Sequence, residues 1–373
     1  MKIILKEVVS RRDWRKFICF PEKLFENDPL FIPSLHSDEK DTLFSDRNPA
    51  YEYCDAKFWL AYSDGEVVGR VGAIINRKSN EVWNEKCVRF GWFDFIEDFD
   101  VFKCLIDKVA EYGRSNGMTK IIGPMGFTDM DKECWVTDGF ENEQNITTLY
   151  NPRYYIDFIS RYGFDVDCEW QQFKIPASQD VPEKVSRINK LISERYKVRL
   201  VEFTRAKDIL PYGHKIFDAL NDAFHILYGF VPLSGKEIDL YVKRYFSFIA
   251  PELVKIVVDE NDDVVGFAIA TPSLTDAFKK IKGSLFPFGW IRALRSLKVY
   301  NEVDLLLNGV RTEWQNRGIH AIYHEALNKT LIERGVKIAY SNPQIIGNKA
   351  VAVWNAQYDC EPYFKRAVFC KIL

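Results

Sequence analysis

The sequence lacks three features that would assign it to a specialised class of protein. Its eight cysteines are scattered and include no C-x-x-C pair, which argues against a disulfide framework or zinc site and favours buried, reduced thiols. No uninterrupted apolar run approaches the roughly 18 residues of a transmembrane helix, and the N-terminus is unlike a signal peptide. The formal net charge of −2 gives no reason to expect a nucleic-acid partner. We therefore expect a cytoplasmic protein without a transmembrane segment.

What the sequence does contain is enough material for two folded domains. It has 373 residues, 47% of them hydrophobic, and includes 28 phenylalanines. Such a chain exceeds one ordinary domain and can bury sizeable cores. Proline, serine and aspartate gather at 176–184, which indicates a join. We expect domains at 1–176 and 177–373, with a helix from Glu183 to Tyr196 after the join.

The same order of elements occurs twice along the chain. Residues 57–76 and 252–272 each indicate a β-hairpin whose second strand begins with an acidic residue and a Val-Val-Gly triplet. Each hairpin is followed by another strand, at 87–95 and 302–310, and then by a helix with an apolar face. A glycine ends each helix, and a short strand that stops at a proline follows. This order predicts an internal duplication of class α/β (mixed α+β), each half a mixed central sheet flanked by helices.

The loop between the second-half strand and its helix resembles a known family. Gln315-Asn316-Arg317-Gly318-Ile319-His320 stands there. This stretch and the order of elements resemble the GNAT superfamily of acyl-CoA-dependent N-acyltransferases, in particular its two-copy bacterial members, whose loop has the pattern Gln/Arg-x-x-Gly-x-Gly/Ala. The resemblance implies that the loop binds the pyrophosphate of acyl-CoA. Backbone N–H groups at the positive end of a helix suit such an anion. A plain turn is the alternative.

One position of this loop departs from the family pattern. His320 stands where the family has glycine or alanine. Its side chain could crowd the phosphates, or its ring could donate a hydrogen bond to them, more strongly when protonated. The sequence leaves both possibilities open.

The first half lacks a comparable loop. Its corresponding stretch, 94–105, has no glycine and places Glu97, Asp98 and Asp100 where phosphates would lie. We therefore expect 1–176 to be a degenerate GNAT-like domain without a phosphate loop and 177–373 to bind one acyl-CoA.

The catalytic candidates combine the strand pattern with the resemblance. Glu302 and Asp304 alternate onto one face of their strand, so either is a candidate base working through water, with a solvated strand start as the alternative. The resemblance implies that Asn348 contacts the pantetheine arm. It also puts Trp354 where the family has a tyrosine that protonates the departing thiolate, and an indole does not do so. Tyr358, one helical turn further on, is the substitute.

Backbone N–H groups where the strand ends, at Leu307, Asn308 and Gly309, could hold the thioester carbonyl if the strand splays from its neighbour. The residues expected to bind the donor are Leu307, Asn308, Gly309, Val310, Gln315, Asn316, Arg317, Gly318, Ile319, His320 and Asn348.

The resemblance implies direct transfer of an acyl group from acyl-CoA, with acetyl-CoA the expected donor, to the amine of a small molecule or amino acid. Acyl-CoA is the co-substrate, and no metal is expected. A non-catalytic acyl-CoA-binding or interaction protein is the first alternative, because His320 and Trp354 depart from the pattern. The second is an N-acyltransferase that takes long chains from acyl-carrier protein. It is motivated by residues 278–300, which contain six Lys and Arg and no acid. An anionic membrane or the CoA phosphates could also attract this segment, or it could be a solvated helix.

Overall fold

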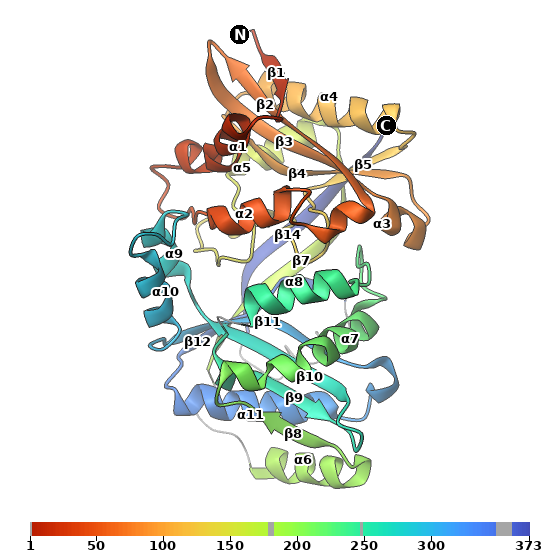
Figure 1. The fold of residues 1–373 in the computed structure, drawn as a ribbon, viewed down its shortest axis with the longest axis vertical. Helices are drawn as coiled ribbons and strands as arrows, with labels where there is room; N and C mark the ends of the chain where they lie inside the picture. Colours follow the sequence, from red (N-terminus) through yellow and green to blue (C-terminus); the bar gives the residue numbers. More distant parts are fainter. Residues whose placement is uncertain (1, 178–182, 247–248, 348–359) are drawn as a thin grey trace. The chain divides into compact units, whose positions relative to one another are not determined.

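The computed structural model describes residues 2–177, 183–246, 249–347 and 360–373 (Figure 1). The chain divides into two units, which are described separately. Unit 1 comprises Met1–Gln171, Thr275–Gly289 and Phe364–Leu373, and unit 2 comprises Gln172–Leu274 and Trp290–Tyr363. None of the helices in the described part of the chain combines the length and apolar character needed to cross a bilayer.

Unit 1 is a mixed sheet with helices packed on it. Its strands pair in the order β1-β2-β3-β4-β5-β14-β7, with β6 pairing β14, and β4 runs parallel to β5. The strands are β1 (Ile4–Glu7), β2 (Cys54–Ser63), β3 (Glu66–Asn76), β4 (Cys87–Phe95), β5 (Lys120–Gly123), β6 (Trp135–Asp138), β7 (Asp165–Pro176) and β14 (Glu361–Ile372). The helices are α1 (Arg11–Leu24), α2 (His36–Leu43), α3 (Arg77–Val82), α4 (Phe99–Ser115), α5 (Arg153–Tyr162) and α9 (Thr275–Ile281).

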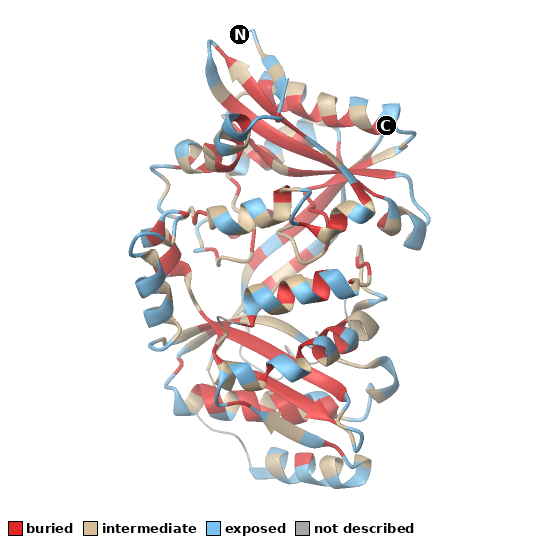
Figure 2. Ribbon diagram, viewed as in Figure 1, coloured by how far each residue is buried: buried red, intermediate tan, exposed pale blue. Residues whose placement is uncertain are grey.

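Both faces of the unit 1 sheet are covered, as the buried central strands in Figure 2 illustrate. Successive side chains of a strand point to opposite faces. Along β2, Trp59 belongs to a core that includes Leu105 of α4, whereas Phe58 and Leu60 belong to a second core that includes Phe17 of α1. The near-continuous apolar character of these strands follows from this double burial.

Unit 2 repeats this plan with the strands that follow Gln171, which include the last part of β7, Gln172–Pro176. They pair in the order β7-β12-β11-β10-β9-β8, with β13 pairing β7, and β11 runs parallel to β12. The strands are β8 (Arg199–Glu202), β9 (Val254–Val258), β10 (Val264–Pro272), β11 (Glu302–Val310), β12 (Ile338–Tyr340) and β13 (Gln344–Ile345). The helices are α6 (Glu183–Tyr196), α7 (Gly213–Phe224), α8 (Gly235–Tyr245), α10 (Gly289–Ser296) and α11 (Ile319–Glu333).

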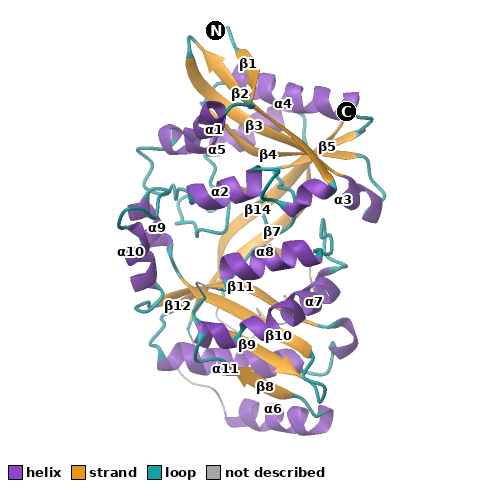
Figure 3. Ribbon diagram, viewed as in Figure 1, coloured by secondary structure: helices purple, strands orange, loops and turns teal. Residues whose placement is uncertain are grey.

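The predicted fold class and the repeated order of elements are confirmed. The series β2, β3, β4, α4, β5 in unit 1 matches β9, β10, β11, α11, β12 in unit 2 (Figure 3). The Val-Val-Gly triplets have the same role in both. A Cβ on Gly69 would lie 2.6 Å from Leu105 Cδ1, and one on Gly266 would lie 2.9 Å from Ile319 Cγ2. Glycine is therefore what allows each helix to approach its strand so closely.

The last strands of the two sequence halves, β7 and β14, pair out of sequence order. Lys174–Pro176 of β7 pair antiparallel with β12 in unit 2, and Phe369–Ile372 of β14 pair antiparallel with β5 in unit 1. In each unit, the strand next to the parallel pair thus comes from the other half of the sequence.

Candidate functional site

Within the part of the chain that the structure describes, β11 has a strand on both sides over only the first part of its length. Glu302–Asp304 pair with Ile338–Tyr340 of β12, whereas pairing with β10 continues to Val310 past a bulge at Leu306. Beyond this point the side chain of Asn342 approaches instead, and its Nδ2 donates to Leu306 O at 2.9 Å. The three leucines of β11 are only half-buried. Among the described residues, no strand therefore pairs with this edge of β11 from Leu306 onward.

The loop that follows β11 is anchored at its start. Arg311 donates to carbonyl oxygens of β10 from its backbone N at 2.9 Å and from Nε at 2.7 Å. Thr312 N donates to Asp222 Oδ2 at 2.6 Å, and Gln315 Nε2 donates to Val310 O at 3.2 Å. These bonds hold the path from the strand to the helix in one conformation.

The helix α11 begins without a side-chain cap. Its N-cap is Gly318, at φ 81°, and Ala321 N donates back to Gly318 O at 3.0 Å. Ile319 and His320 are the first two helical residues, where backbone N–H groups have no intrahelical acceptor. Together with the helix dipole, they make this terminus attractive to an anion. A Cβ on Gly318 would also lie 2.6 Å from Ile192 Cδ1, but this atom is the end of a flexible side chain, so the left-handed φ is what favours glycine here.

The predicted loop residues before Gly318 are accessible to solvent. Gln315, Asn316 and Arg317 are all exposed. The guanidinium of Arg317 lies over two rings, 4.9 Å from the centre of Trp314 and 5.5 Å from that of Tyr196. This double stacking holds a positive charge beside the start of α11.

Two histidines lie on the first turns of α11. The rings of His320 and His324 have their centres 6.4 Å apart. Partial desolvation of its ring lowers the pKa of His320, and desolvation followed by the nearby His320 lowers the pKa of His324 to about 3. Both imidazoles are therefore predominantly neutral at pH 7. Residue His320 is exposed and His324 is half-buried.

The two predicted carboxylates of β11 have different surroundings. Asp304 is fully buried, whereas Glu302 is half-buried. The alternative of a solvated strand start therefore does not hold for Asp304.

Sequence reasoning missed a neighbouring tyrosine. Tyr340 pairs with Asp304 across the β11–β12 ladder, and its ring centre is 5.2 Å from that of Tyr363. Burial, then the charge of Glu302, raises the pKa of Tyr340. The phenol thus stays protonated and can donate a hydrogen bond. Tyr340 is the last residue of β12, which runs parallel to β11 with its candidate bases, and this position could have identified Tyr340 from the sequence.

The structure places Leu307–Val310 on the open part of β11 and 315–320 in the adjoining loop and first turn of α11. Of the remaining candidates, Asn348, Trp354 and Tyr358 lie outside the described residues.

In unit 1, the equivalent strand edge and helix start are both occupied. Met125 N donates to Phe90 O of β4 at 2.9 Å, and a Cβ on Gly91 would lie 2.5 Å from Met125 O. Asp98 is the N-cap of α4, and its Oδ1 accepts from Asp100 N at 2.8 Å and from Val101 N at 3.2 Å. This carboxylate supplies the negative charge that a bound anion would otherwise bring.

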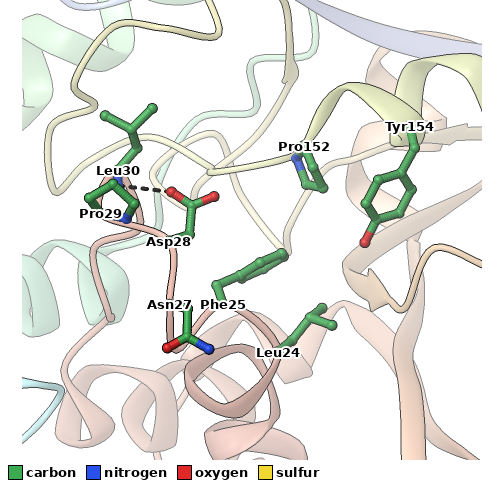
Figure 4. Close-up of a pocket in the computed structure, with 8 residues that line it drawn as sticks. All are labelled: Leu24, Phe25, Asn27, Asp28, Pro29, Leu30, Pro152 and Tyr154. Carbon is green, nitrogen blue, oxygen red and sulfur yellow. Dashed lines mark hydrogen bonds between the residues drawn. The ribbon is translucent and has the colours of Figure 1, made fainter.

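Unit 1 has an open pocket of about 510 Å³ after α1 (Figure 4). It is lined by Leu24, Phe25, Asn27, Asp28, Pro29, Leu30, Pro152 and Tyr154. The carboxylate of Asp28 accepts from Leu30 N at 2.9 Å and from the hydroxyl of Tyr150. Both carboxylate oxygens of Asp28 thus accept hydrogen bonds from neighbouring segments of unit 1, and the role of Asp28 is structural.

Unit 1 also groups a thiol, a carboxylate and an imidazole. Cys19 Sγ lies 3.9 Å from His36 Nε2, and this same nitrogen contacts Glu22 Oε1. A relay would need the two groups on different ring nitrogens. Burial and then Glu22 raise the pKa of Cys19, so the thiol stays protonated and is a poor nucleophile. The geometry is that of a structural His–Glu contact.

Comparison with known sequences finds relatives over most of the chain. No family model matches the sequence. "Protein YghO" of Escherichia coli is 25% identical over 319 residues, which cover 84% of this chain and 80% of that protein. A bacterial ceramide synthase of Caulobacter vibrioides is 24% identical over 312 residues, which cover 83% of this chain and 80% of that protein.

Solved structures with a similar fold also span the whole chain. A tandem GNAT protein from the clavulanic acid biosynthesis pathway matches with a TM-score of 0.56 over 100% of this chain and 98% of that chain, at 11% identity. A GCN5-related N-acetyltransferase from Sphaerobacter thermophilus matches with a TM-score of 0.51 over 99% of this chain and 95% of that chain, at 12% identity. At these identities the likeness establishes the fold.

Proposed function

Given that this chain has the tandem GNAT fold, we propose that it is a cytoplasmic N-acyltransferase that binds acyl-CoA on unit 2 and transfers the acyl group to an amine. The observation that carries this proposal is the continuity between the open edge of β11 and the uncapped start of α11, joined by the anchored loop at 311–317. Acyl-CoA in an extended conformation needs a strand edge with apolar or amide groups to bind its pantetheine arm, and an anion site to bind its pyrophosphate. Unit 2 offers both in adjacent positions.

The proposed donor site uses backbone groups at one end and a strand edge at the other. The pyrophosphate accepts hydrogen bonds from the N–H groups of Ile319 and His320, and Arg317 adds a stacked positive charge nearby. The pantetheine arm lies along β11 from Val310 toward Leu306. The N–H groups of Leu307–Gly309 are then close to the thioester carbonyl, where they act as an oxyanion hole.

The proposed reaction is direct attack of a neutral amine on the thioester carbonyl carbon. A C–N bond forms, the C–S bond breaks, one amine proton passes through water to Glu302 or Asp304, and the thiolate of CoA takes up a proton. The family pattern puts the tyrosine for this last role at the position of Trp354, and Tyr358, one helical turn further on, is its substitute. The protonated phenol of Tyr340 is a second candidate, because it adjoins Asp304 in the parallel ladder.

The proposal assigns different roles to the two sequence domains. Residues 177–373 hold the donor, and residues 1–176 form a degenerate copy that binds none. Asp98 supports this division, since its carboxylate already caps α4 and would repel a pyrophosphate at that helix start. One acyl-CoA per chain is the expected stoichiometry.

A relative that is named a bacterial ceramide synthase bears on the class of substrate. A ceramide contains an amide between a fatty acyl group and a long-chain amino alcohol. Long-chain donors and lipid amines therefore join acetyl-CoA, small amines and amino acids as candidates for this chain. The half-buried leucines of β11 favour a long chain, because an alkyl group lying on them would remove apolar surface from water.

Calorimetric titration of the full chain with acetyl-CoA, octanoyl-CoA and palmitoyl-CoA tests the donor site. The informative variant is His320→Glu, with His320→Gln as the neutral control of the same length. A glutamate in the first turn favours the helix by about 0.3–1 kcal/mol, so the variant should fold while its charge repels pyrophosphate. We expect about a tenfold or larger loss of affinity in His320→Glu and a smaller change in His320→Gln.

Release of free CoA thiol in a panel of amines then tests the reaction. If no thioester binds the wild-type chain, the loop is a turn and the enzyme proposal fails. Binding without thiol release in any amine would identify a non-catalytic acyl-CoA-binding protein. Acylation from acyl-carrier-protein thioesters alone would identify the second alternative, and a preference for long-chain donors and lipid amines would align the chain with its ceramide synthase relative.

A further inference from the structure

The basic aromatic segment, residues 278–300, is left unexplained by the acyl-CoA site. It contains six basic residues and no acid: Lys279, Lys280, Lys282, Arg292, Arg295 and Lys298. Lys279 pairs with Glu143. The other five are exposed, and the structure gives them no salt bridge among the residues it describes. The segment therefore presents a concentrated positive charge in a chain whose overall charge is −2.

The same segment exposes large apolar side chains to solvent. The exposed fractions are 80% for Phe286, 72% for Phe288, 45% for Trp290, 47% for Ile291 and 41% for Leu294. The two phenylalanines belong to unit 1 and the other three residues to unit 2, and a single glycine separates Phe288 from Trp290, so these residues are continuous in sequence. Clustered exposed apolar side chains with polar residues around them mark sites of contact with proteins or membranes.

Helix α10 (Gly289–Ser296) has no buried residue, as its tan and pale-blue ribbon in Figure 2 shows. At about 100° per residue, Trp290 and Leu294 lie on one side of it, while Arg292 and Arg295 lie on the other. A helix whose apolar and basic sides are both exposed contributes little to a protein core. This arrangement is the pattern of helices that lie in the plane of a membrane interface.

We propose that the basic aromatic segment docks this protein on an anionic lipid bilayer surface. The aromatic and aliphatic side chains of 286–294 enter the headgroup boundary, where phenylalanine and tryptophan are favoured. The basic side chains contact lipid phosphates, each adding an attraction that decays within a Debye length. The proposal concerns membrane binding alone and holds whether or not the chain catalyses acyl transfer.

An acidic carrier protein would fit the charge of the segment, but it would not account for its exposed rings. Recognition by charge alone requires Lys and Arg and leaves no reason for two phenylalanines to be more than two-thirds exposed beside them. An anionic bilayer interacts with both the basic side chains and the exposed rings. It would also place the protein where long-chain thioesters and lipid amines partition.

Sedimentation of the full chain with vesicles tests the proposal. One set of vesicles contains phosphatidylcholine alone, and the other contains phosphatidylcholine mixed with phosphatidylglycerol. We expect binding to the mixed vesicles that weakens with added salt, and much weaker binding to phosphatidylcholine. The variant R292E/R295E should lose about tenfold or more of the affinity for mixed vesicles. The variant F286S/F288S should lose the part of the binding that resists salt.

The matched control reverses two charges on another exposed amphipathic helix. Lys184 and Arg187 lie on α6, which also exposes Leu191 and Ile188. K184E/R187E should bind mixed vesicles like the wild-type chain. Equal loss in both charge-reversal variants would overturn the assignment to residues 278–300, as would no binding of the wild-type chain to mixed vesicles. Binding to an acyl-carrier protein that R292E/R295E abolishes, with no vesicle binding, would replace the membrane by an acidic protein partner.

Discussion

In unit 1, helix α4 follows β4, and its N-cap is Asp98, whose carboxylate accepts hydrogen bonds from two backbone N–H groups. In unit 2, the equivalent helix α11 follows β11, and its N-cap is Gly318, which offers no side-chain cap. The strands before these helices differ in the same way. Met125 lies at the edge of β4, whereas β11 beyond Leu306 pairs with β10 on one side, and on its other side the described residues supply the Asn342 side chain at Leu306 O. Unit 1 thus satisfies polar groups at its helix start and strand edge from within the chain, whereas the helix start of unit 2 has no side-chain cap among the described residues.

In a duplicated scaffold, one copy can keep the interactions that stabilise it while the other copy keeps groups that suit a ligand. A capped helix start gains stability from its own acid, but the same acid excludes an anionic ligand. An uncapped start forgoes that stability and retains the ability to bind. Four experiments, in order of decreasing expected effect, test whether the two copies differ in this way.

The largest effect is expected at the two glycines beneath the helices. Gly69→Ala and Gly266→Ala should each lower the free energy of unfolding by about 1–3 kcal/mol, because the new Cβ overlaps Leu105 or Ile319. Only Gly266→Ala should also weaken acyl-CoA binding, since Ile319 is the first residue of α11. Denaturant unfolding and calorimetry measure the two effects.

The control for these substitutions is Gly235→Ala, where a Cβ meets no atom within 4 Å and the change should be nearly neutral. Equal loss of acyl-CoA affinity in the Gly69 and Gly266 variants would contradict the assignment of the donor to unit 2.

The two units should respond to acid in opposite directions. Burial lowers the pKa of His324 to about 3. Below pH ~6.5, His324 therefore binds a proton in the unfolded state but stays neutral in folded unit 2. Stability of unit 2 should fall as the pH falls, by about 2 kcal/mol at pH ~5. In unit 1, burial raises the pKa of Asp129 and Glu133, so the folded state binds protons more readily and stability should rise over the same range.

Native-state hydrogen exchange of the α4 and α11 amides at neutral and mildly acidic pH measures this difference. The substitution His324→Gln should flatten the response of α11 and leave that of α4 unchanged. Equal acid destabilisation of both helices would show that the two units do not titrate independently.

Removing the cap of unit 1 should affect stability alone. Asp98→Ala leaves Asp100 N and Val101 N without their acceptor, and we expect a loss of about 1 kcal/mol. Asp98→Asn keeps a side-chain acceptor and should lose less. Acyl-CoA affinity should be the same in both variants as in the wild-type chain. A weaker donor affinity in Asp98→Ala would mean that unit 1 takes part in binding.

The smallest effect concerns the proton on His320. Burial lowers its pKa, and a phosphate that accepts a hydrogen bond from the ring would raise it on binding. Affinity for acyl-CoA should then rise a few-fold as the pH falls from about 8 to about 6, and His320→Gln should abolish this dependence. If the imidazole crowds the phosphates instead, the affinity will not depend on pH and His320→Ala will bind more tightly.

Much of the fold could be predicted from local sequence patterns. The helix at Glu183–Tyr196 and the strands at 87–95 and 302–310 have the predicted bounds. Their apolar periods and their glycine or proline ends are properties of a few consecutive residues. The stacking of Arg317 on Tyr196 and the pairing of Tyr340 with Asp304 could not be predicted in this way. Each joins residues that are far apart in the sequence and depends on how separate elements pack.

By itself, the sequence determined the two copies, the order of their elements and the contrast between Asp98 and the Gly318 loop, because turn chemistry, period and charge are local. Only the tertiary structure decided that β7 pairs with β12 and β14 with β5, that β11 opens after its bulge, and that Asp304 is buried beside Tyr340. A strand can form ladder hydrogen bonds with any suitable edge, so its partner is selected by the packing of the whole sheet.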